Sequence, residues 1–245
     1  MWGEVIRYAE ATSTNELARD HARRGAGEGT AIVAAFQARG RGRRGRVWEA
    51  PPGKALLVSF VLRPPAYAAH SAWLTLAGGV AAARAVRDLT GRDARLKWPN
   101  DVLFEGKKVG GVLAESYRVA ETVCILGLGL NANQSLEEMT GELAETATSL
   151  LIATGGEWSV EALLDGVTGH LQELYGHLVR GDNEAVRAAW RELDNTVGRL
   201  VEVDSPEGRW SGRATDIDEY GALVVEQEDV ARRVTVGDVT VRFAE

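Results

Sequence analysis

The sequence predicts a fold of the α/β (α+β) class, in which helices flank a mixed β-sheet and a small β-barrel follows at the C-terminal end. Apolar runs of strand length alternate with long helical patterns as far as Leu193. After Asn195, short β-branched runs separated by turn residues replace that pattern. The length of 245 residues is enough for one large and one small domain, and we expect the boundary near Asp194, between residues 1–194 and 195–245.

The first domain alternates between strand and helix signals. Strands are predicted over five apolar runs: Ala31–Phe36, Ala55–Leu62, Val102–Phe104, Val109–Leu113 and Val123–Leu130. A helix is predicted over Ser71–Leu89 and ends at Gly91, and Gly78-Gly79 within it indicates close packing on a sheet. Further helices are predicted over Val160–Val179 and Asn183–Leu193.

The second domain contains short strands only. Its β-branched runs are Leu200–Val203, Arg209–Ile217, Leu223–Glu226 and Val239–Phe243. Four or five short strands in about 50 residues are typical of a small barrel and not of further α/β layers.

The composition excludes several classes of partner. With 28 Lys and Arg against 35 Asp and Glu, the net charge is -7, which argues against bulk binding to nucleic acid or anionic membranes. The single cysteine, Cys124, rules out an internal disulfide and a cysteine-based zinc site. The longest apolar run, Ala55–Leu62, is far shorter than the roughly 20 residues that span a bilayer. We expect a soluble, cytoplasmic protein with no DNA and no membrane partner.

The most unusual segment is the Arg-Gly segment, residues 37–48 (QARGRGRRGRVW). Gly40, Gly42 and Gly45 match the dinucleotide pattern G-x-G-x-x-G, but Pro51-Pro52-Gly53 stands where a helix would have to begin, so that interpretation fails. Five arginines among three glycines repel one another and lack a packing partner, whereas a polyanion supplies one. We expect a loop that is disordered when empty and ordered around a nucleotide triphosphate or its product. A solvated basic loop or an RNA-binding segment is the alternative.

A second cluster is Lys97-Trp98-Pro99-Asn100-Asp101, followed by Lys108 and Gly110-Gly111. Lysines suit a carboxylate or phosphate, and Asp101 suits Mg²⁺ or a proton. The alternative is a tight turn with solvated lysines.

Two further segments have polar or small residues at element ends. Ser13 and Glu16 match a capping box at the start of a helix, although the hydroxyls of Ser13 and Thr14 also suit a small polar ring. Gly127 and Gly129 end a buried strand and leave room for a flat ligand, or mark a bulge.

Taken together and in order, these segments resemble a biotin protein ligase, that is, a biotin–carboxyl-carrier-protein ligase. The resemblance extends over nearly the whole chain and includes a C-terminal stretch, Ile217–Glu226, that is similar to the family's small SH3-like domain. It is carried by Ser13-Thr14-Asn15, Gln37, Gly40 to Trp48, Lys97 to Asp101, Lys108, Gly110-Gly111 and Gly127 to Asn131.

The resemblance implies an enzyme that uses ATP to activate biotin as biotinyl-5′-AMP and then acylates one lysine of a carboxylase carrier domain. It implies biotin contacts from Ser13, Thr14, Asn15, Gln37, Gly40, Arg41, Gly42, Arg43, Lys108, Gly111, Gly127 and Gly129. It implies ATP contacts from Arg43, Arg46, Trp48, Lys97, Asn100 and Asn131, with Trp48 over the adenine. Arg43, Lys97, Asp101 and Lys108 would carry the chemistry, with Mg²⁺ as a cofactor and Asp101 as its ligand or as a base.

Several alternatives stay open on the sequence. A lipoate ligase shares the fold and the adenylate chemistry, although the Arg-Gly and Lys-Trp-Pro-Asn-Asp segments follow the biotin pattern. An RNA-binding module would need a basic face with stacking aromatics, whereas the chain is acidic and 7% aromatic. Some members of the resembled family carry a DNA-binding winged helix before the Ser-Thr-Asn segment, and twelve residues cannot hold one, so we expect a ligase without repressor activity. A homodimer is left open.

Overall fold

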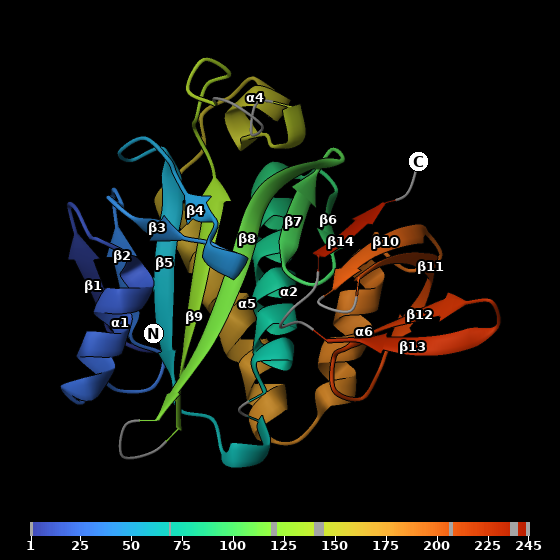
Figure 1. Ribbon diagram of the computed structural model, residues 1–245. Helices are drawn as coiled ribbons and strands as arrows, with labels where there is room; N and C mark the ends of the chain where they lie inside the picture. Colours follow the sequence, from blue (N-terminus) through green and yellow to red (C-terminus); the bar gives the residue numbers. More distant parts are fainter. Residues whose placement is uncertain are drawn as a thin grey trace.

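Seven strands form the central sheet of the computed structural model, which describes residues 2–68, 70–118, 122–139, 145–205, 208–235 and 240–243. Their order is β1-β2-β5-β9-β8-β7-β6 (Figure 1). β1 and β2 run parallel and the other neighbours run antiparallel, so the predicted mixed sheet is confirmed. The strands are β1 (Val5–Tyr8), β2 (Ala31–Ala34), β5 (Ala55–Leu62), β6 (Ala94–Lys97), β7 (Asp101–Phe104), β8 (Lys107–Arg118) and β9 (Thr122–Asn131).

Helices cover the two faces of this sheet unequally. α2 (Ser71–Thr90) and α5 (Val160–Val179) lie side by side behind it in Figure 1, with α6 (Asn183–Leu193) next to them. α1 (Thr14–Arg23) packs on the opposite face. Because successive residues of a strand face opposite ways, Leu126 joins the core under α2 and α5 while Ile125 packs with Ala18 of α1. The larger core lies under α2 and α5, and the smaller core under α1 covers only part of the opposite face. The rest of that face is available for a site.

The double glycine within α2 is explained by close packing on β8 and β9. A Cβ at Gly78 would lie 3.0 Å from Val112 Cγ1 and 3.2 Å from Leu126 Cδ2. The helix ends at Gly91, whose φ of 66° is left-handed, as predicted. α5 and α6 have the predicted bounds.

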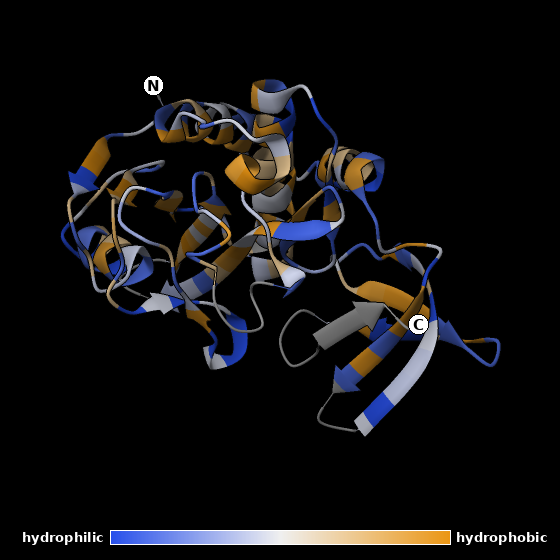
Figure 2. Cartoon of the chain, turned by 90° about the horizontal axis from the view of Figure 1, so that it is seen from above, coloured by the Kyte–Doolittle hydropathy of each residue, from blue (hydrophilic) through white to orange (hydrophobic). Residues whose placement is uncertain are grey.

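The C-terminal domain is a five-stranded antiparallel sheet, ordered β13-β12-β11-β10-β14. In Figures 1 and 2 it stands beside the larger domain. Val201, Val203, Ala214 and Val225 are buried and alternate with half-buried or exposed residues, which is the pattern of a half-buried sheet. The strands are β10 (Leu200–Ser205), β11 (Gly208–Ile217), β12 (Leu223–Gln227), β13 (Val230–Val234) and β14 (Thr240–Phe243).

Trp98 attaches the two domains to each other. Its side chain is 1% exposed, its indole N–H donates to the Gly221 carbonyl at 3.1 Å, and its backbone N–H donates to Thr196 Oγ1 at 2.9 Å. A second connection comes from α6, where Arg187 and Arg191 form ion pairs with Asp216 of β11. The Lys-Trp-Pro-Asn-Asp turn is therefore held from the C-terminal domain.

Other elements were not predicted or differ from the prediction. β1, β6, β13 and the short helix α4 (Leu150–Thr154) had no clear signal. The predicted capping box is wrong, because the Ser13 side chain makes no capping hydrogen bond within the described part of the chain. Gln37 Oε1 instead accepts from the Thr14 N–H at 2.7 Å, so the segment that follows β2 satisfies the helix start. None of the helices described is long and apolar enough to cross a membrane.

Candidate active site

Glycines on the α1 face of β8 and β9 form the floor of the site. A Cβ at Gly127 would lie 2.0 Å from Asn15 Oδ1, and one at Gly129 would lie 2.5 Å from Trp48 Cε2. A Cβ at Gly111, the β8 neighbour of Gly129, would meet nothing nearer than 3.6 Å. Close approach therefore requires glycine at two of these positions and permits a side chain at the third.

The N-terminus of α1 forms the polar end of the site. Gln37 Oε1 accepts from the Thr14 N–H and from Thr14 Oγ1, at 2.7 and 3.0 Å. Ser59 Oγ lies 2.8 Å from Thr14 Oγ1 and 2.6 Å from Asn15 Oδ1. Ser13, the N-cap residue, is 2% exposed. This network brings the predicted Thr14, Asn15 and Gln37 together.

Ser59 belongs to this network and was missed. It is fully buried, and it is the one polar residue in the run ALLVSFVL of β5. A hydroxyl in the middle of an otherwise apolar, fully buried strand needs a partner, which is the signal that could have identified it.

The Arg-Gly segment forms a hairpin above the floor. β3 (Gly40–Arg41) pairs with β4 (Val47–Trp48), and the 3-10 turn η1 (Arg43–Gly45) joins them. The hairpin crosses in front of β5, β9 and β8 in Figure 1. A Cβ at Gly40 would lie 2.1 Å from the Trp48 carbonyl oxygen, so the pairing itself requires a glycine there. That the segment becomes ordered only around a nucleotide stays a prediction.

The arginines of the hairpin divide into two groups. Arg43 is half-buried, and its Nη1 donates to Asn100 Oδ1 at 3.0 Å. Burial lowers the pKa of its guanidinium, and the charge of Asp101 opposes that shift. Arg44 and Arg46 are exposed, and Gly42 donates its N–H to the Arg46 carbonyl at 2.7 Å to close the turn. The predicted ATP contact of Arg46 stays a prediction.

The second cluster of predicted residues meets Arg43 at the turn between β6 and β7. Lys97 of β6 and Asp101 of β7 lie opposite each other in the strand register. Lys108 Nζ lies 2.5 Å from Asp101 Oδ1. Asn100 is held by its Nδ2, which donates to the Val112 carbonyl at 3.1 Å. Arg43 and Lys108 therefore contact the turn at Asn100 and Asp101, and Lys97 is the strand neighbour of Asp101, beside the glycine floor.

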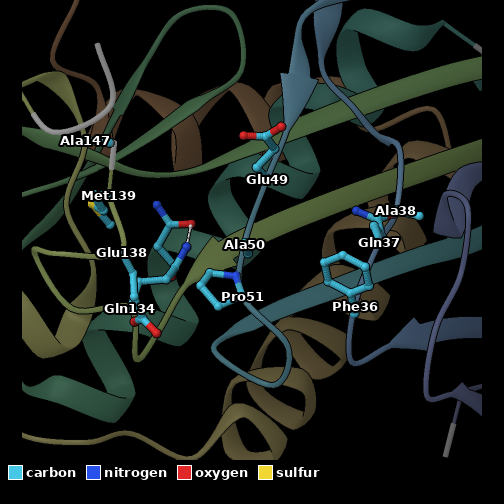
Figure 3. Close-up of a pocket in the computed structure, with 11 residues that line it drawn as sticks. Phe36, Gln37, Ala38, Glu49, Ala50, Pro51, Gln134, Glu138, Met139 and Ala147 are labelled. Carbon is cyan, nitrogen blue, oxygen red and sulfur yellow. Dashed lines mark hydrogen bonds between the residues drawn. The ribbon is translucent and has the colours of Figure 1, made fainter. Parts of the chain in front are cut away.

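A pocket of about 310 Å³ opens next to the polar end of the site, and Gln37 belongs to both (Figure 3). The Asn131 amide is already engaged, because Nδ2 donates to the Thr148 carbonyl at 3.1 Å and Oδ1 accepts from Gln134 Nε2 at 3.0 Å. The lining residues are Phe36, Gln37, Ala38, Glu49, Ala50, Pro51, Asn131, Gln134, Glu138, Met139 and Ala147.

The predicted metal site at Asp101 lacks supporting ligands. The described residues contain no group of three or more His, Cys, Asp or Glu side chains that could hold a metal ion. The Asp101 carboxylate is paired with the Lys108 ammonium. A lone carboxylate with a cationic partner does not fit a resident Mg²⁺.

Comparison with known proteins identifies the family. Residues 6–131 match the Biotin/lipoate A/B protein ligase family, and residues 196–242 match the Biotin protein ligase C terminal domain. The chain belongs to this family. The first match spans the strands, glycines and cationic turn described above, and the second spans the five-stranded sheet.

Relatives of this family cover the chain almost end to end. The Biotin--[acetyl-CoA-carboxylase] ligase of Mycobacterium tuberculosis is 34% identical over 97% of this chain and 89% of its own length. The Bifunctional ligase/repressor BirA of Bacillus spizizenii is 30% identical over 97% of this chain and 74% of its own length. A biotin protein ligase from Aquifex aeolicus, solved in complex with biotin and ATP, superposes with a TM-score of 0.85 at 28% identity, covering 98% of this chain and 99% of that one.

Proposed function

We propose that this protein uses ATP to convert biotin to biotinyl-5′-AMP and then transfers the biotinyl group to a lysine of a carboxylase carrier domain. The observation that carries the proposal is the convergence of Arg43, Lys97 and Lys108 on one turn beside a glycine-floored slot. Family membership and the relatives named as biotin ligases support the choice of acid.

In the proposed arrangement, biotin lies along the floor with its two ends in different environments. Its ureido ring faces Thr14, Asn15 and Gln37, whose hydroxyl and amide groups offer donors and acceptors without net charge. Its carboxylate faces Arg43 and Lys108, the cationic end. The polarity of the slot thus matches a molecule that is neutral at one end and anionic at the other.

In the first step, a carboxylate oxygen of biotin attacks the α-phosphorus of ATP, the bond to the β-phosphate breaks, and pyrophosphate leaves. Two anions must meet, so charge repulsion and orientation dominate the barrier. Arg43, Lys97 and Lys108 neutralise the carboxylate and phosphate oxygens, each worth about 3–4 kcal/mol when well placed. Mg²⁺ enters with ATP, bound to phosphate oxygens as part of the substrate.

In the second step, the neutral amine of the carrier lysine attacks the acyl carbon, and the bond between that carbon and the phosphate oxygen breaks. AMP leaves with the bonding electrons, and the amine nitrogen releases one proton to solvent. The ion pair of Asp101 favours a positioning role for this residue, because its Oδ1 lies 2.5 Å from Lys108 Nζ. The same ion pair engages Oδ1, one of the two oxygens that a general base could use.

The nucleotide base is proposed to bind near Trp48. The indole N–H of Trp48 is buried and has no hydrogen-bond partner among the residues described. Glu49 and Glu138 line the neighbouring pocket, and their negative charge suits a base with amino groups better than a triphosphate. We therefore place the base on the Trp48 side and the phosphates on the side of the cationic turn.

The test is to incubate the protein with ATP and either biotin or lipoate, and to identify the bound adenylate by mass spectrometry. Biotinyl-5′-AMP with biotin, and no adenylate with lipoate, is the expected result. Lipoyl-AMP alone would assign the chain to the lipoate branch of the chemistry. Addition of a purified carrier domain, followed by detection with streptavidin, then tests the transfer step.

A further inference from the structure

Glu115 lies between the polar end of the site and the Arg-Gly hairpin. Its Oε2 accepts from Asn15 Nδ2 at 2.7 Å, and its Oε1 pairs with Arg41 Nη2 at 3.1 Å. Its side chain is 20% exposed, whereas that of Arg41 is 43% exposed. One carboxylate therefore joins the start of α1 to the first strand of the hairpin.

The strand register explains this position. Glu115 follows Gly111 at four residues along β8, so both lie on the same face of the sheet. Its neighbour in β9 is Ile125, which packs with Ala18 of α1. Burial, and after it the charge of Glu115, raises the pKa of Tyr117, which lies two residues further along β8. The carboxylate thus lies between the start of α1 and the first strand of the hairpin.

Glu115 also determines which way the Asn15 amide points. Asn15 Oδ1 lies 2.6 Å from Ser59 Oγ and faces Gly127, so its Nδ2 must face the other way. A carboxylate has acceptors only, and it therefore matches that Nδ2 and the Arg41 guanidinium at the same time. A glutamine could match one of them with its oxygen but would direct N–H donors at the other.

We infer that Glu115 is a positioning residue, which couples filling of the biotin slot to closure of the Arg-Gly hairpin. This inference rests on the proposed function and extends it to a residue outside the predicted site. A ring bound against Asn15 fixes that side chain, Asn15 fixes Glu115, and Glu115 holds Arg41 down over the slot. A closed hairpin in turn keeps water away from the mixed anhydride.

The coupling predicts a split in the kinetics of Glu115→Gln. Lys108 and Arg43 are untouched, so the maximal rate of adenylate formation stays within about 3-fold of the unaltered chain. The KM for biotin and the rate at which biotinyl-5′-AMP escapes both rise, roughly 10- to 100-fold, which is the value of a hydrogen bond to a charged group. A residue that served only stability would lower the unfolding midpoint and leave this split absent.

The matched control is Glu105→Gln. Glu105 is an exposed glutamate at the turn between β7 and β8 and pairs with Arg92, away from the slot. A second variant, Arg41→Gln, removes the other end of the ion pair and leaves Asn15 in place. If the pair acts as one unit, adenylate escape from the double variant is well below the product of the two single effects.

The experiment measures biotin-dependent ATP–pyrophosphate exchange, adenylate escape, and trypsin cleavage between Arg41 and Arg46 with and without biotin plus Mg-ATP. The expected result is faster cleavage and escape in Glu115→Gln and Arg41→Gln, and unchanged values in Glu105→Gln. If the unaltered chain forms the adenylate but Glu115→Gln and Glu105→Gln show the same cleavage and escape rates, the coupling alone is overturned. No adenylate from the unaltered chain would overturn the proposed function and the coupling with it.

Discussion

Replacing Gly127 with alanine tests the closest contact in the site. The added Cβ would lie 2.0 Å from Asn15 Oδ1, whereas ordinary Cβ contacts begin at 3.4 Å. The Asn15 amide must therefore retreat by about 1.4 Å or rotate. Either movement breaks the 2.6 Å contact with Ser59 and disturbs the 2.7 Å hydrogen bond with Glu115.

The magnitude follows from the buried polar atoms that lose a partner. Asn15 is 4% exposed, so water does not replace Ser59, and an unsatisfied buried acceptor costs about 1–3 kcal/mol. An alanine also restricts the unfolded chain, which returns about 0.4–1 kcal/mol. We expect a net loss of about 1–2 kcal/mol in the free energy of unfolding and a KM for biotin at least about 10-fold higher.

For stability, Gly111→Ala is the matched control, because its Cβ would meet no protein atom nearer than 3.6 Å. It carries the same gain from the unfolded chain, so the difference between the two variants isolates the clash. Urea unfolding and biotin-dependent ATP–pyrophosphate exchange measure the two quantities. Equal stability of the two variants, together with a KM for biotin that Gly127→Ala leaves unchanged, would refute the assignment of Gly127 to the floor.

Three further predictions concern other parts of the chain. Trp48→Ala should raise the KM for ATP about 5- to 140-fold without changing that for biotin, since stacking on a base is worth about 1–3 kcal/mol; a rise for biotin alone would contradict it. Thr196→Val leaves the buried Trp98 N–H unpaired and should lower the free energy of unfolding by about 1–3 kcal/mol, whereas Thr215→Val, at an exposed hydroxyl, should have little effect on urea denaturation. Burial raises the pKa of Glu28, so the folded state binds its proton more tightly than the unfolded state and stability from this group is present at low pH and lost as pH rises through the raised value. As the pH is lowered from 7 to 4.5, the urea midpoint of the unaltered chain should therefore rise relative to that of Glu28→Gln. A difference in urea midpoint that stays constant over this pH range would contradict the prediction.

The sequence predicted the elements that have a strong internal signal. α5 and α6 have clear apolar periodicity and side-chain caps at Ser159 and Asp182, and their predicted bounds are confirmed. β1 and β6 are four-residue strands, of which β1 is only partly buried, so their periodicity is too short to detect. Their existence depends on pairing with neighbours distant in sequence.

The same distinction applies to the site. The Arg-Gly segment, the cationic turn and the glycine strand are each visible as local patterns, and so their residues were predicted. Ser59 interrupts an apolar strand, which signals a buried polar contact without naming its partner, and Glu115 lies beyond the predicted strand Val109–Leu113. The role of each depends on a contact with Asn15, across 44 and 100 positions of the chain. The capping box at Ser13 failed for the same reason, because Gln37, in the segment after β2, reaches the helix start.

The central claim is that cations at the turn between β6 and β7 promote adenylate formation, and adjacent lysines test it directly. Lys108 contacts Asp101, whereas Lys107 is exposed on the same strand. In single-turnover formation of biotinyl-5′-AMP, Lys108→Ala should be about 10²- to 10³-fold slower than the unaltered chain. Lys107→Ala should react at the rate of the unaltered chain. Equal rates for the two variants would contradict the claim.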